Sequence, residues 1–142
     1  MKRYSVIIIL FALGLYSCKK TDTSSNFNEN LKIKMFETVD STKKTLFFNC
    51  FTEKIFECSN FSIQATYTLS KDKIIINFIQ IEKPNICLTS LGPASTLIKL
   101  EGLTNKLYEV ELNFGATKIT GQLNISASSF KATVPTQTKV QF

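Results

Sequence analysis

The sequence predicts an all-β fold, an antiparallel β-sandwich of about seven strands, after an export signal and a short polar tether. Three observations predict this organisation. The chain begins with a basic segment and a short apolar run. Apolar and polar residues then alternate over roughly eight to ten residues in several segments, and turn-forming residues separate these segments at about ten-residue spacing. No segment has the 3.6-residue apolar period of an amphipathic helix.

Residues 1–17 have the layout of a secretory signal peptide. The basic segment Met1-Lys2-Arg3 precedes an apolar run of about ten residues. A membrane-spanning helix needs roughly 20 apolar residues, so this run is too short to span a bilayer. Leu15-Tyr16-Ser17-Cys18 resembles a bacterial lipobox. The resemblance implies that residues 1–17 are cleaved off and that Cys18 carries lipid, which holds the protein on a membrane.

The segment after Cys18 is polar. Residues 19–30 read KKTDTSSNFNEN, which is typical of a flexible coil with a reach of roughly 17–21 Å. The sequence therefore predicts a lipidated Cys and tether over residues 18–30 and one folded domain over residues 31–142.

The predicted strands of that domain follow one another along the chain. Residues 61–70 alternate, with an apolar odd-numbered face and a polar even-numbered face, as in a strand with one wet side. Residues 107–114 also alternate, with the apolar residues at even-numbered positions. Residues 73–81 are apolar almost throughout, which favours a central strand. The weaker candidates are 31–39, 45–51, 95–100, 116–125 and 129–134. Ser70-Lys71-Asp72-Lys73 and Gly115 are predicted hairpin turns.

The composition excludes several classes of function. The chain has no His and no Trp, so Ser-His-Asp and Cys-His catalysis and imidazole metal sites are impossible. We expect no catalytic residues, no metal and no cofactor. The formal charge is +6, but the lysines are spread along the chain and Arg3 is the only arginine, so we expect no nucleic-acid partner. Glu109 and Glu111 are expected on one solvated strand face.

Three cysteines remain after Cys18, and export to an oxidising compartment favours a disulfide. Cys58 precedes the strand 61–70, and Cys87 follows the strand 73–81. A hairpin of these two strands would bring both cysteines to the same end, so we predict the pair Cys58–Cys87. The competing pair is Cys50–Cys58. Cys50 lies in the apolar stretch LFFNCF and is predicted to be a buried free thiol.

The longest predicted loop, residues 82–95, is the candidate binding site. It contains two prolines and the predicted disulfide anchor, and rigidly held loops are where binding residues concentrate. The candidate binding residues are Lys83, Asn85, Leu88 and Thr89. A braced loop of this kind also fits a protease inhibitor that occupies a protease cleft as a substrate mimic. The simpler interpretation is a connection that the disulfide stabilises.

Residues 87–126 resemble the immunoglobulin-like domain of small envelope lipoproteins from Bacteroidota. The matching features are a cysteine before a Gly-Pro-Ala segment, a leucine and a tyrosine at a corner, and a glycine hairpin; they are Cys87, Gly92, Pro93, Ala94, Leu103, Tyr108 and Gly115. The resemblance implies an immunoglobulin-like sandwich and supports Cys87 as a disulfide partner.

The same resemblance implies a location on the bacterial outer membrane. Surface display in that group goes with acidic residues after the lipidated Cys, whereas Asp22 is the single acid of Lys19-Lys20-Thr21-Asp22, so a periplasm-facing anchor is favoured over the cell surface. Asp40-Ser41-Thr42 resembles the O-glycosylation acceptor of these bacteria. We expect a non-enzymatic lipoprotein that binds another envelope protein or has a structural role, with a protease inhibitor acting through residues 82–95 as the alternative.

Overall fold

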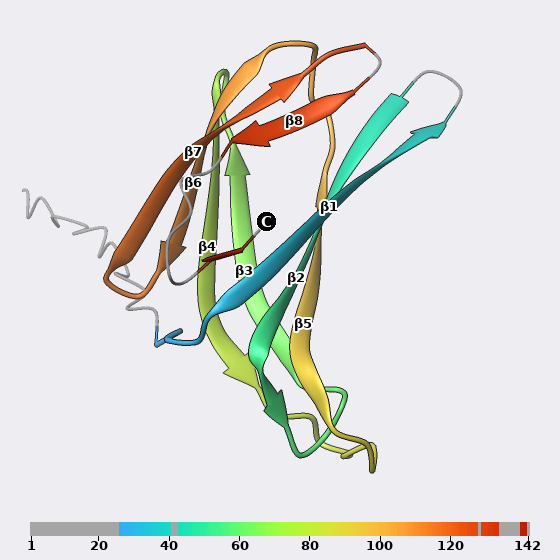
Figure 1. The fold of residues 1–142 in the computed structure, drawn as a ribbon, viewed down its shortest axis with the longest axis vertical. Coiled ribbons are helices and arrows are strands. Elements are labelled where there is room, and N and C mark those ends of the chain that lie inside the picture. Colours follow the sequence, from blue (N-terminus) through green and yellow to red (C-terminus); the bar gives the residue numbers. More distant parts are fainter. Residues whose placement is uncertain (1–25, 41–42, 128, 134–139, 142) are drawn as a thin grey trace, which may run out of the picture.

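The computed structural model describes residues 26–40, 43–127, 129–133 and 140–141, and these residues form strands and no helix (Figure 1). The predicted signal peptide 1–17, the predicted lipidation residue Cys18 and the predicted glycosylation acceptor Ser41 lie outside the described residues. The strands that these residues form are β1 (Leu31–Asp40), β2 (Lys43–Phe56), β3 (Ser62–Leu69), β4 (Lys73–Glu82), β5 (Gly92–Leu100), β6 (Leu107–Phe114), β7 (Thr117–Ile125), β8 (Phe130–Thr133) and β9 (Val140–Gln141).

The strands belong to one curled sheet with the order β8-β7-β6-β4-β3-β5-β2-β1-β9 (Figure 1). Two halves can be distinguished in it, β9-β1-β2-β5 and β3-β4-β6-β7-β8. Among the described residues, the ladder pairing between the two halves is the pair Ser62 of β3 with Ser95 of β5. The all-β prediction is confirmed, and the one curled sheet takes the place of the two separate sheets expected of a sandwich.

The expectation of purely antiparallel pairing is wrong. β4 pairs with β6 in parallel, and so do β3 with β5 and β1 with β9. The physical reason is the path of the chain. After β4 it crosses to the other half of the sheet to form β5 beside β2, and it then returns as β6 next to β4. A strand that returns after such a crossover runs in the same direction as the strand it joins.

The two halves bury their apolar faces against each other in one core. β4 illustrates how the sequence builds it, since Ile74, Ile76 and Phe78 are fully buried and alternate with less buried residues. Phe78 stacks on Phe114 of the neighbouring β6, with ring centroids 4.8 Å apart. β1, β2, β5 and β7 contribute to the same cluster, so the core is shared by both halves of the sheet.

The folded domain begins before the predicted tether ends. Phe27 is 3% exposed and its ring lies 5.7 Å from the ring of Phe78. Nearby, Glu29 forms an ion pair with Lys54 at 2.9 Å. Part of the predicted tether therefore packs against the core, with the ring of Phe27 supplying the apolar contact.

The end of β2 is bent by a register shift against β5 between Phe51 and Ile55. The side chain of buried Thr52 replaces backbone hydrogen bonds that are missing at this shift. Its hydroxyl accepts the Ala94 N–H at 3.0 Å and donates to the Lys54 carbonyl at 2.8 Å. A bulge of this kind re-aims the residues that follow it. Ile55 is directed outward by this bend and is 57% exposed.

The predicted turns are present, and Tyr108 forms a side-chain contact with the backbone just before β6. Ser70 N–H donates to the Lys73 carbonyl at 2.8 Å, which closes the β3–β4 hairpin, and Gly115 has the positive φ of 55° expected between β6 and β7. Buried Tyr108 accepts the backbone N–H of Thr104 at 3.0 Å through its hydroxyl, a contact that also occurs at the tyrosine corner of immunoglobulin-like domains.

Candidate binding site

The loop between β4 and β5 is shorter than predicted. Glu82 ends β4 and Gly92 begins β5, so the connection covers residues 83–91 and is called the disulfide loop below. It lies at one end of the molecule, beside the segment that joins β2 to β3 (Figure 1). The four residues predicted to bind, Lys83, Asn85, Leu88 and Thr89, are all exposed.

A disulfide connects the disulfide loop to the β2–β3 segment. Cys58 and Cys87 are bonded, with their Cα atoms 5.3 Å apart, which is ordinary for a disulfide. The predicted pairing is confirmed, and the competing pair Cys50–Cys58 is wrong. The hairpin reasoning explains the result, since β3 and β4 pair from Ser62 with Glu82 onward and bring the two cysteines to the same end.

Side chains of the β2–β3 segment hold the backbone of the disulfide loop from the other side. The Asn60 amide donates to the Ile86 carbonyl at 2.7 Å, and its oxygen accepts the Leu88 N–H at 3.2 Å. The hydroxyls of Ser59 and Ser90 are 2.7 Å apart. These contacts satisfy loop backbone groups within the protein, and together with the disulfide they leave the loop little freedom to rearrange.

Gly92 allows the two segments to approach closely. A Cβ atom added at this position would lie 2.8 Å from the Ser59 Cα and 2.9 Å from its Cβ, closer than carbon atoms can approach. Ala94, two residues along β5, is fully buried. Gly92 and Ala94 of the Gly-Pro-Ala segment are therefore the small residues at the start of β5, where Gly92 lies against Ser59 of the β2–β3 segment.

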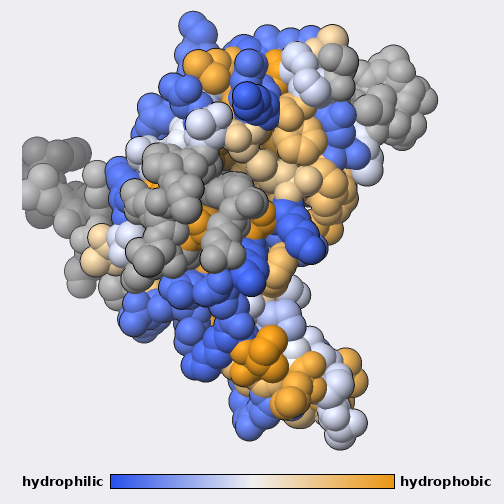
Figure 2. Space-filling model, viewed as in Figure 1, coloured by the Kyte–Doolittle hydropathy of each residue, from blue (hydrophilic) through white to orange (hydrophobic). Residues whose placement is uncertain are grey.

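The braced loop presents large apolar side chains to solvent. Exposure reaches 79% at Ile86, 55% at Leu88 and 75% at Leu91, and Ile55 at the end of β2 is also exposed. We call these four residues the apolar tip. Figure 2 shows hydrophobic side chains gathered at the lower end of the molecule, where Figure 1 places the disulfide loop. Exposed apolar clusters on otherwise polar proteins mark interaction sites.

Sequence reasoning found Leu88 but missed the other members of the apolar tip. Ile86 and Leu91 lie inside the predicted loop. Large aliphatic residues in a loop without strand alternation are the sequence signal that could have identified them. Ile55 carried no usable signal, because its exposure depends on the bulge that ends the regular β2–β5 pairing.

Two ion pairs lie on the segments that carry the apolar tip. Lys83 contacts Glu57 at 2.8 Å across the two braced segments, with both side chains largely exposed. The hydrogen bond from Lys83 lowers the pKa of Glu57. Lys54, next to Ile55, is paired with Glu29. The site therefore offers an apolar surface with a polar rim, the usual arrangement of protein–protein interfaces.

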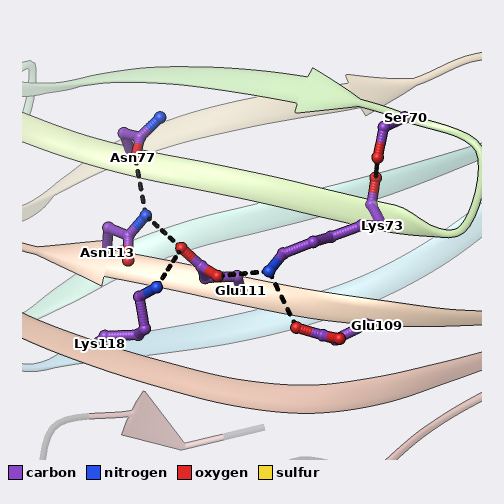
Figure 3. Close-up of polar contacts among 7 residues, drawn as sticks. All are labelled: Ser70, Lys73, Asn77, Glu109, Glu111, Asn113 and Lys118. Atoms are coloured by element: carbon purple, nitrogen blue, oxygen red, sulfur yellow. Dashed lines mark hydrogen bonds and ion pairs between the residues drawn. The ribbon is translucent and has the colours of Figure 1, made fainter.

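A second polar cluster lies on the outer face of β4, β6 and β7 (Figure 3). Glu111 is only 7% exposed, and two lysines reach it: Lys73 at 2.7 Å and Lys118 at 2.9 Å. Asn113 donates to its carboxylate at 3.1 Å. Lys73 also contacts Glu109, which is 52% exposed, at 3.0 Å. The expectation that Glu111 lies on a solvated face is wrong, because the long lysine side chains cover it.

This arrangement does not supply a proton donor. The hydrogen bonds from Lys73, and then from Lys118, lower the pKa of Glu111 to about 2, and the hydrogen bond to Glu111 raises the pKa of Lys73. Paired carboxylates can hydrolyse glycosides, but the carboxylic acid that donates the proton in such an enzyme needs a raised pKa. The cluster is a structural ion-pair network that joins β4, β6 and β7.

Cys50 is a buried free thiol, as predicted. Burial raises its pKa to about 12, so the reactive thiolate is hardly populated at neutral pH. Within the described part of the chain, no group of three or more acidic, cysteine or histidine side chains could hold a metal ion.

Comparison of the chain with protein family models, curated proteins and solved structures finds no match. None of the residues that the structure describes belongs to a helix long and apolar enough to cross a membrane.

Proposed function

We propose that this protein is a lipid-anchored lipoprotein of the bacterial outer membrane that binds another envelope protein through the apolar tip and performs no catalysis. The observation that carries the proposal is the combination of rigid bracing with exposure. Ile86, Leu88 and Leu91 are exposed by more than half on a loop fixed by a disulfide and by Asn60.

The energetics favour recognition by this surface. Burying a large aliphatic side chain contributes roughly 1.5–3 kcal/mol, so covering the apolar tip would supply several kcal/mol toward binding. Association normally costs free energy for ordering loops and side chains at the interface. The bracing removes much of that cost, because the loop is already held in one conformation in the free protein.

The location rests on the N-terminal sequence. The lipobox-like Leu15-Tyr16-Ser17-Cys18 supports lipidation at Cys18, and two acyl chains anchor a protein stably where one does not. The resemblance to immunoglobulin-like envelope lipoproteins is part of this proposal, and the contact between Tyr108 and Thr104 supports it. A periplasm-facing orientation fits the single acid, Asp22, among the four residues that follow Cys18.

The experiment is cross-linking in intact cells with the lipidated protein as bait and a soluble Cys18→Ala form as the control. The proposal expects one envelope protein, captured by the anchored form and lost in an Ile86→Glu/Leu91→Glu double variant. Leu107→Glu is the matched control, because Leu107 is 52% exposed at the start of β6, away from the apolar tip. Capture that survives the double variant would contradict the proposal.

The alternative is a protease inhibitor that acts through the disulfide loop, which the same bracing supports. The inhibitor would bind an envelope or extracellular protease equally with or without lipid. Replacing Lys83 and Leu88 with Glu would then abolish inhibition. Retained inhibition in that variant would exclude the loop as the inhibitory element.

A further inference from the structure

Among the described residues, most of the β3 edge that faces away from β4 has no strand partner. On one side β3 pairs with β4 along its whole length, from Ser62 opposite Glu82 to Leu69 opposite Ile74. On the other side its one partner among the described residues is Ser95 of β5, opposite Ser62. Beyond that pair β3 and β5 diverge (Figure 1), and residues 64–69 pair with no described strand on this side.

The backbone groups that point to the open side can be assigned. Ser70 N–H bonds the Lys73 carbonyl in the hairpin with β4. Successive residues of an antiparallel ladder direct their N–H and C=O groups to opposite sides. The N–H and C=O groups of Leu69, Tyr67 and Ala65 therefore point away from β4. The Phe61 carbonyl also points away from β4, because it accepts the Ser95 N–H of β5 at 3.2 Å.

This edge also lacks the protection that strand edges normally carry. Charged residues, especially lysines, and prolines discourage edge-to-edge pairing. No charged residue or proline occurs between Ser62 and Ser70. Every other described strand except the two-residue β9 contains charged residues, for example Lys34 in β1, Lys99 in β5 and Lys118 in β7.

We propose that β3 is the contact strand of a symmetric dimer, in which two copies of this chain pair edge to edge in antiparallel orientation about a two-fold axis at Tyr67. With the axis at this position, Tyr67 faces Tyr67 of the second copy, and Ala65 faces Leu69. All three residues carry outward N–H and C=O groups, so each pair exchanges two hydrogen bonds.

The side chains of the strand match under this symmetry. On the outer face Thr66 stands opposite Thr68 of the second copy, and both threonines are exposed in the free chain. On the other face Ala65 stands opposite the larger Leu69 of the second copy, and the two half-exposed Tyr67 side chains meet at the axis. Thr–Thr and aromatic cross-strand pairs are favourable in antiparallel sheets, and a two-fold interface must be self-complementary in this way.

A cysteine at the axis tests the register. In the full-length chain in detergent, treated with a mild oxidant, Tyr67→Cys should give a covalent dimer on a non-reducing gel, because hydrogen-bonded pairs have Cα atoms about 5.5 Å apart, within disulfide range. Thr66→Cys is the matched control, since its two copies would be diagonal neighbours about 7–8 Å apart. Equal cross-linking of the two variants, or none with Tyr67→Cys, would overturn the proposal.

A charge exchange tests the pairing without new covalent bonds. Thr66→Lys/Thr68→Lys places like charges opposite each other twice and should raise the dimer dissociation constant about tenfold or more. Thr66→Lys/Thr68→Glu places opposite charges there and should restore the wild-type value. Both variants change exposed side chains, so folding is retained and is checked by circular dichroism. A wild-type chain that sediments as a monomer, or a double-lysine variant that dimerises like the wild type, refutes the dimer.

Discussion

Replacing Glu111 with Gln tests the ion-pair network that joins β4, β6 and β7. Glu111 is 7% exposed and contacts Lys73 and Lys118, which lower its pKa from 4.5 to about 2. A lowering of this size corresponds to about 3 kcal/mol of stabilisation of the folded state at neutral pH. Glu111→Gln keeps the side-chain volume and removes the charge, so it should lower the free energy of unfolding by about 2–3 kcal/mol.

The pH dependence has a definite sign. Because the carboxyl pKa is lower in the folded state than in the unfolded state, the stabilisation is complete above the unfolded value of 4.5 and is lost as the pH falls toward about 2. The difference in free energy of unfolding between wild type and Glu111→Gln should therefore shrink from about 2–3 kcal/mol at pH 6 to roughly half of that at pH 3.

Urea unfolding of both proteins at several pH values measures this difference. The matched control is Glu109→Gln, which removes a carboxylate bound to the same Lys73 but 52% exposed. Because exposed ion pairs contribute little, it should cost less than about 1 kcal/mol. Equal destabilisation by the two variants, or a Glu111→Gln difference that stays constant from pH 6 to pH 3, would refute the reasoning.

Three further predictions concern the disulfide loop and the core. Replacing Cys58 and Cys87 with Ser should lower the free energy of unfolding by about 3–4 kcal/mol, since the bond closes a loop of about 30 residues; an unchanged urea midpoint would contradict this. Gly92→Ala should cost about 1–3 kcal/mol and speed proteolysis of the disulfide loop, because its Cβ would overlap Ser59; wild-type stability would mean the contact relaxes freely. Cys50 should resist a thiol reagent at pH 8 and react only on unfolding, given its burial and its pKa of about 12; fast labelling of the native protein would show that it is accessible.

The strands and the disulfide could be predicted because both depend on local patterns. Alternation in residues 61–70 and 107–114 sets one apolar face for each strand, and β3 and β6 occupy these segments. The Ser70–Lys73 hairpin brings the segments that follow and precede it together, and with them Cys58 and Cys87. Such features require neighbouring residues alone.

The order of strands and the composition of the candidate site depend on distant contacts. Nothing local in β5 indicates that it leaves β4 and pairs with β2, and this crossover makes β4 and β6 parallel. Phe27 stands in a polar segment of the sequence, and its packing against the core depends on Phe78, which is distant in sequence. Glu111 lies at an alternating polar position, and its burial depends on Lys73 and Lys118 from two other strands.

The central claim is that the apolar tip binds an envelope protein, and site-specific photo-cross-linking in living cells tests it most directly. A photoreactive residue is placed at Ile86 in the lipidated protein, and at Leu107 in the control. The proposal predicts one adduct with a single envelope protein from position 86, absent from position 107 and abolished by Leu91→Glu. Adducts of the same protein from both positions, or no adduct from position 86, would contradict the claim.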